Sequence, residues 1–187
     1  WEVKHLEDIA DIIMGQSPSG DSCNVMEVGK PLLNGPTEFG LYHPTAVQFT
    51  ETPTKYAQEG DILFCVRGST TGRMNWADRE YVIGRGLAAI RHKQGNSYQK
   101  FLRSFLEFKL LDLLKVTTGS TFPNISGDEL RSITIPVPKL GEQLEMSKVI
   151  SSIDEVITEN INSIDELKKS KSGLMQDLLS GKKRVKV

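Results

Sequence analysis

The sequence is poor in the residues on which most metal sites and disulfide frameworks depend. It has two cysteines, Cys23 and Cys65, far apart and in no CxxC pair, and three histidines without metal-like spacing. So little cysteine argues against a disulfide framework and is typical of a reducing cytosol. No apolar run of about 18 residues occurs, so we expect no membrane span. These absences predict a cytoplasmic protein with no metal site.

Motifs for catalysis are also missing. There is no GxxxxGK[ST] loop for nucleotide phosphates and no GxGxxG sequence that opens a helix. Neither Ser69 nor Ser120 lies in a GxSxG frame. Asp61, in the sequence Gly-Asp-Ile-Leu, is better interpreted as a turn residue before a strand than as a catalytic acid. We therefore expect no catalytic residue and no cofactor on this chain.

Charge is nearly balanced overall but unevenly distributed. The 187 residues carry a formal net charge of −1, which by itself does not indicate a nucleic-acid partner. Between residues 67 and 115, however, Lys and Arg outnumber Asp and Glu by ten to four. This local excess is compatible either with solvated faces or with a surface that attracts phosphate.

The longest uninterrupted pattern lies near the end of the chain. Residues 142–180 contain no proline and one glycine, Gly173, and predict a helix of roughly 58 Å. Steps of three and four residues define a heptad seam that is mostly apolar. Such a stripe needs another long helix, which this chain does not supply. The seam residues, and therefore the expected dimer interface, are Ile150, Ile153, Ile157, Asn160, Ile164, Leu167, Lys171, Leu174 and Leu178.

Two seam positions, Asn160 and Lys171, are polar. A buried Asn in a coiled coil costs stability but fixes the register and orientation of the helices. Alternatively, the drift of a straight helix turns these two residues outward.

The preceding residues predict a β-rich head. Residues 1–15 indicate a short strand and then a short helix that ends at Gly15. Four prolines exclude long helices from residues 25–54. The apolar run over 62–67 predicts a strand, 81–91 predicts a strand pair broken by Gly84 and Gly86, and alternation predicts a strand over 133–137. A change of period predicts one or two helices over 98–115.

The boundary of the head follows from local signals. Ser126 and Glu129 have capping-box spacing, and Pro136 and Pro138 close the last strand. We therefore predict an α+β fold, with a mixed α/β domain over residues 1–138. A long helix and a basic tail follow over residues 139–187.

Several of these stretches together resemble a known family. The run TGSTFPNISGDELRSITIPVPKLGEQ, the helical ISSIDEVI and the ending KSGLMQDLLSGKKRV resemble the specificity subunit of type I restriction–modification enzymes. The opening WEVKHLEDIA and the segment GDIL followed by RGS are similar to that family's target recognition domain.

The resemblance implies a division of labour. Such a subunit reads double-stranded DNA, while separate modification and restriction subunits methylate and cleave it. S-adenosylmethionine and ATP would then belong to those partners. The family usually has two recognition domains and two helices that pair antiparallel. This chain has one of each, so it is expected to be a homodimer-forming half-subunit or one half of a longer subunit.

The DNA-binding candidates are polar or basic residues in predicted loops. Arg can neutralise phosphate or pair with guanine, and hydroxyl side chains adapt to several bases. Ordinary turn chemistry and surface ion pairs are the alternatives for these residues. The candidates are Arg67, Ser69, Thr70, Thr71, Arg73 and Arg85, then Ser120, Thr121 and Asn124, and finally Gln16 and Ser17.

Two other classes of function stay open at this point. A coiled-coil assembly scaffold would use the head to bind protein without DNA specificity. A stand-alone enzyme would methylate DNA without partner subunits, but the sequence offers no motif for it.

Overall fold

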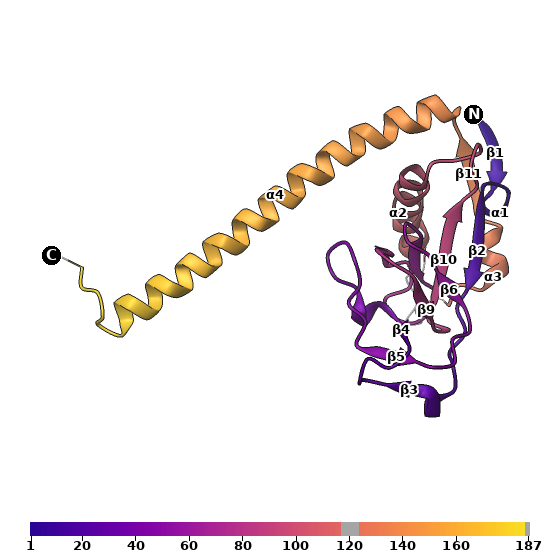
Figure 1. The fold of residues 1–187 in the computed structure, drawn as a ribbon. Helices are drawn as coiled ribbons and strands as arrows, with labels where there is room; N and C mark the ends of the chain where they lie inside the picture. The colour runs from indigo at the N-terminus through magenta and orange to yellow at the C-terminus, as the bar shows by residue number, and fades with distance from the viewer. Residues whose placement is uncertain (117–123, 186–187) are drawn as a thin grey trace. The chain divides into compact units, whose positions relative to one another are not determined.

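The computed structural model describes residues 1–116 and 124–185. The chain divides into two compact units, with the boundary between Leu144 and Glu145. We call the first unit the head and the second the helical unit (Figure 1). The long helix α4, Leu140–Leu179, begins within the head, where Gln143 is buried and donates from Nε2 to Pro138 O at 2.9 Å. The predicted division at residue 138 stays a prediction.

The N-terminal segment differs from its prediction. After β1 (Glu2–His5), helix α1 (Leu6–Ile9) is a single turn, and β2 (Ala10–Met14) follows directly. The helix predicted to reach Gly15 is therefore wrong. Ile12 and Ile13 instead pair antiparallel with Ile90 and Ala89 of β10, so sheet pairing outweighs the local helical spacing.

Two larger sheets form the head (Figure 1). The four-stranded sheet has the order β2-β10-β7-β8 and is antiparallel throughout. Its other strands are β7 (Ile62–Cys65), β8 (Met74–Trp76) and β10 (Leu87–His92).

The five-stranded sheet has the order β3-β5-β4-β9-β6 and contains one parallel pair, β4 with β9. The strands are β3 (Cys23–Asn24), β4 (Lys30–Leu33), β5 (Gln48–Thr50), β6 (Tyr56–Ala57) and β9 (Tyr81–Ile83). Two 3-10 turns, η1 (Gly20–Ser22) and η2 (Pro36–Glu38), lie in the connections.

A smaller ribbon and two helices complete the head. Strand β11 (Thr134–Val137) pairs antiparallel with β1. Helix α2 (Gln99–Val116) packs against β10, with Leu102 and Leu106 fully buried. Ser126 is the N-cap of helix α3 (Gly127–Arg131), and the predicted capping box with Glu129 is confirmed.

The core of the head is built from the strands of both larger sheets. Leu33, Leu63, Ile83 and Leu87 are fully buried in one cluster. Beside it, Asp61 is 1% exposed and accepts two hydrogen bonds from Arg91, at 2.7 and 2.8 Å. This ion pair ties the turn before β7 to β10.

The α+β architecture, with a β-rich head and one long C-terminal helix, confirms the predicted fold class. Among the described helices, none has a stretch both long and apolar enough for a membrane span.

Candidate nucleic-acid interface

Polar segments from distant parts of the sequence meet in the head. Ser17 Oγ accepts a hydrogen bond from the backbone N–H of Arg85 at 3.2 Å. The N–H of Val66 donates to Gly86 O, and the N–H of Ile125 donates to Val66 O, both at 2.9 Å. We call the segments 15–17, 34–35, 66–73, 84–86 and 124–126 the loop cluster. It brings together the predicted site residues that the structure describes.

The 66–73 segment is the hairpin loop between β7 and β8. Gly68 and Gly72 have φ values of 80° and 90°, which side chains other than glycine rarely adopt. Thr71 is 6% exposed and donates its hydroxyl to Gly68 O at 2.8 Å. Thr71 therefore stabilises the turn, as the alternative interpretation proposed. Ser69 and Thr70 are exposed at the loop surface.

The three predicted arginines have different surroundings. Arg73 donates from its guanidinium to Pro36 O and Phe39 O, both at 3.3 Å, and so holds the η2 segment against the hairpin. Arg67 and Arg85 are exposed, and their guanidinium groups have no hydrogen bond or ion pair within the described part of the chain. These two side chains are therefore available for an external anion.

A junction of glycines determines how closely the segments approach. A Cβ on Gly15 would lie 2.1 Å from Gly84 O, and one on Gly84 would lie 2.5 Å from Asn34 Oδ1. A Cβ on Gly86 would lie 2.4 Å from Asn34 O. A Cβ on Gly15 or Gly86 would meet a backbone oxygen, so packing requires glycine at these two positions, whereas a Cβ on Gly84 would displace the Asn34 amide.

Sequence reasoning missed one residue of this junction. Asn34, exposed and directly after β4, donates from Nδ2 to Gln48 Oε1 at 2.7 Å. Gln48 is half-buried on β5. The Asn34-Gly35 dipeptide is a turn signal that could have indicated Asn34, whereas nothing in the sequence distinguishes Gln48.

The remaining predicted loop residues have local partners where they are described. Asn124 Oδ1 accepts from Gly68 N at 3.4 Å, which links the two loops. Gln16 is exposed, and its carbonyl accepts from the Thr54 hydroxyl. Ser120 and Thr121 lie outside the described residues.

The electrostatics of the loop cluster favour anions. Its five segments contain three arginines and no carboxylate. In α3, Glu129 accepts from the Ser126 hydroxyl at 2.7 Å and from the Ser126 N–H at 2.8 Å. These two bonds hold the pKa of Glu129 below its ordinary value of 4.5. Glu129 therefore stays ionised as a helix cap.

The described part of the chain contains no group of side chains that could bind a metal ion. Nowhere in residues 1–116 or 124–185 do three His, Cys, Asp or Glu side chains gather in a way that could hold an ion. Both cysteines are unpaired thiols.

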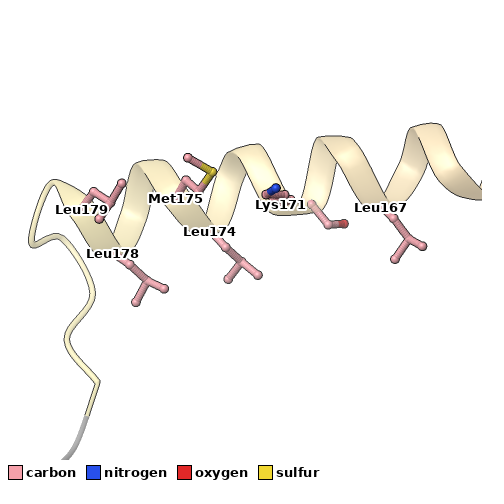
Figure 2. A pocket seen from close by; sticks show the side chains of 7 residues that line it. Leu167, Lys171, Leu174, Met175, Leu178 and Leu179 are labelled. Carbon is pink, nitrogen blue, oxygen red and sulfur yellow. The ribbon is translucent and has the colours of Figure 1, made fainter.

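The helical unit offers a second surface of a different kind. Seam residues Ile153, Ile164 and Leu167 are 58%, 51% and 69% exposed. Leu167, Leu174 and Leu178 project from the same side of α4 (Figure 2). Asn160 donates from Nδ2 to the Val156 carbonyl of its own helix at 2.8 Å. The heptad seam is therefore a stripe of exposed apolar side chains that contains Asn160 and Lys171.

Comparisons with known proteins found related sequences over almost the whole chain. The family profile described as type I restriction modification DNA specificity domain matches residues 1–169. The putative type I restriction enzyme MjaX specificity subunit of Methanocaldococcus jannaschii is 37% identical, over all of this chain and 44% of that protein.

Solved structures show the same fold. A chain from a study titled "Structural basis underlying complex assembly and conformational transition of the type I R-M system" is 32% identical, with a TM-score of 0.80 over 96% of this chain. The HsdS subunit from Thermoanaerobacter tengcongensis is 30% identical, with a TM-score of 0.76 over 95%. The chain spans 45% and 44% of those two chains, less than half of each.

Proposed function

The chain belongs to the family of type I restriction–modification DNA specificity domains, and on this premise we propose that it reads one half of a bipartite DNA site. The observation that carries the proposal is the loop cluster. It gathers exposed Arg67 and Arg85 with hydroxyl side chains on a scaffold held by backbone hydrogen bonds.

Reading DNA requires contacts of two kinds. Cationic side chains on phosphates supply affinity, and contacts to base edges supply specificity. Arg67 and Arg85 can do either, because a guanidinium binds phosphate or pairs with guanine O6 and N7. Arg73 acts mainly by holding the η2 segment in place, since its guanidinium already donates to two carbonyls.

The helical unit then sets the spacing of two readers. At 40 residues, α4 is about 60 Å long. Its exposed seam pairs with the equivalent helix of a second copy, or with the second helix of a longer subunit. In the first case two identical heads read a palindromic split site, because a two-fold axis relates them.

Catalysis belongs to partner subunits in this proposal. The chain is a recognition subunit that docks methyltransferase and restriction subunits, and S-adenosylmethionine and ATP bind to those partners. The absence of catalytic motifs from the sequence supports this assignment.

A selection experiment tests the proposal directly. The full chain, together with its methyltransferase subunits, is incubated with a library of randomised duplexes, and the bound DNA is sequenced. We expect enrichment of two short motifs at one fixed spacing. If no bipartite sequence is bound more strongly than random duplex, the proposal is wrong.

The alternative is a coiled-coil assembly scaffold without DNA specificity. Arg67→Ala with Arg85→Ala should weaken DNA binding and reduce the salt slope by about 1 to 2, because each lost phosphate contact contributes about 0.9. Lys139→Ala, which removes one positive charge outside the loop cluster, is the control for each single arginine variant. Unchanged affinity and slope in the double variant would favour the scaffold.

A further inference from the structure

An amide pair lies directly beside the arginine turn of the loop cluster. Asn34 Nδ2 donates to Gln48 Oε1 at 2.7 Å. The two residues come from neighbouring strands, because Leu32 of β4 pairs with Gln48 of β5 and Asn34 follows β4. Asn34 is exposed and Gln48 is half-buried. The half-buried Gln48 amide can therefore hold the exposed Asn34 amide in a fixed orientation.

The bond to Gln48 leaves part of the Asn34 amide available. A primary amide has two N–H donors and a carbonyl with two lone pairs. Within the described residues, the Asn34 side chain makes only the hydrogen bond to Gln48. One N–H of Nδ2 and the Oδ1 carbonyl remain, so a donor lies next to an acceptor. Exchanging the O and N positions in both amides would make Gln48 the donor and leave Asn34 with both N–H groups and one carbonyl lone pair, so a donor still lies next to an acceptor.

Glycines on both sides of Arg85 place it next to this amide. The closest approaches are to the Asn34 Oδ1 and O atoms, where a Cβ on Gly84 or Gly86 would clash. The turn can therefore lie against the Asn34 backbone only if residue 86 lacks a side chain, and a side chain at residue 84 would displace the Asn34 amide. As a consequence, an amide and a guanidinium are presented side by side on one rigid support.

These two groups match two different base edges. In the major groove, adenine presents an N7 acceptor beside an N6 donor, which an Asn amide can bind with two hydrogen bonds. Guanine presents two acceptors, which suit Arg. We infer that Asn34 reads an adenine in the half-site, that Gln48 positions Asn34, and that Arg85 contacts an adjacent base pair or its phosphate. The inference rests on the proposed DNA-reading function and names part of its specificity.

The first test changes the hydrogen-bonding pattern of Asn34. Asn34→Asp replaces the N–H donors by a second acceptor, and carboxylates accept from cytosine N4. In the duplex selection with methyltransferase subunits, we expect one adenine position of the motif to lose its preference, by about tenfold or more. Cytosine should gain at that same position. Thr37→Asp adds the same charge on exposed η2 without touching the pair, and should keep the adenine.

The second test separates positioning from reading. Gln48→Ala removes the acceptor that holds Asn34, so the adenine preference should weaken without another base replacing it. Gln48→Glu keeps a carboxylate oxygen at the position of Oε1, where it still accepts from Asn34, and should restore the preference. If the Asn34–Gln48 hydrogen bond served only to stabilise the fold, these variants would change the thermal midpoint and leave the base preference unchanged.

The outcomes distinguish this inference from the function on which it rests. If the parent protein enriches no motif, the proposed function fails and the inference fails with it. If the parent enriches a bipartite motif but Asn34→Asp alters no base preference, the inference alone is overturned. A shift from adenine at one position, with the rest of the motif intact, supports it.

Discussion

The loop cluster and the seam of α4 are stabilised in opposite ways. Loops of the head are fixed by backbone hydrogen bonds and glycine contacts above a core whose side chains are fully buried. The seam residues of α4 are apolar yet about half exposed, as in Ile157 and Ile164 at 48% and 51%. The head can therefore hold its shape by itself, whereas the apolar stripe reaches its lowest free energy only against another surface.

A deletion in the core of the head should have the largest effect on stability. Phe64 is fully buried in β7, so Phe64→Ala should lower the free energy of unfolding by about 3–5 kcal/mol. Leu167→Ala, on the exposed seam, is the matched truncation and should change the free energy of unfolding of the head by little. Denaturant unfolding followed by near-UV circular dichroism measures both. Equal losses in the two variants would contradict the comparison.

A charge in the seam should affect association instead. In Ile157→Asp, pairing would bury an unpaired carboxylate, which is costly without a compensating partner. We expect a large loss of dimer mass in light scattering, and Leu167→Asp should do the same. Glu159→Asp, which keeps the charge on the exposed helix surface, is the control. A parent protein that is monomeric alone at all concentrations would mean that the partner helix comes from a longer subunit.

The glycine junction should respond to the addition of a single methyl group. Gly84→Ala would put a Cβ 2.5 Å from Asn34 Oδ1, so the turn or the amide must move. Because the atom met is the end of an exposed side chain, the cost in stability should be about 1 kcal/mol, the lower end for overpacking, and the main effect should be on DNA selectivity. Gly35→Ala is the control, because its Cβ would meet no atom within 4 Å. A Gly84→Ala variant with parental stability and selectivity would show that the close approach is unnecessary.

The sequence predicts those parts of the fold that depend on residues close together in the chain, and fails where strands distant in sequence pair. The long helix, α2 and the Ser126 capping box follow from local patterns, and all three are present. The helix predicted near the N-terminus was wrong because Ile12 pairs with Ile90, a residue far from it in the sequence. The parallel contact between β4 and β9 is equally non-local and was not predicted.

The candidate site shows the same limit. Residue types identified Arg67, Ser69 and Arg85 as loop candidates, but only the fold places Ser17 and Asn124 in the same cluster. Gln48 carries no local signal, since its importance comes from the partner that it meets across two strands. The roles of these residues in DNA binding stay predictions until the selections are made.

The smallest expected effect on stability comes from the capping box of Ser126 and Glu129, at the edge of the loop cluster. Hydrogen bonds from Ser126 lower the pKa of Glu129 in the folded state, so ionised Glu129 stabilises the head. That contribution is complete above the ordinary value of 4.5 and is lost as the pH falls through the lower folded pKa. Glu129→Gln cannot titrate, so its stability deficit relative to the parent should shrink as the pH falls below 4.5.

Thermal midpoints measured from neutral to acidic pH would test this dependence, with Asp128→Asn as the control for the loss of one carboxylate from the same helix. The segment before α3 supplies the Ile125 N–H to Val66, so fraying of the cap should loosen the hairpin loop first. The protection factor of the Ile125 N–H, which relates its exchange rate to the intrinsic rate at the same pH, should therefore fall at low pH in the parent before those of the rest of the head. A uniform loss of protection across the head would mean instead that the loop cluster has no separate stability from the core.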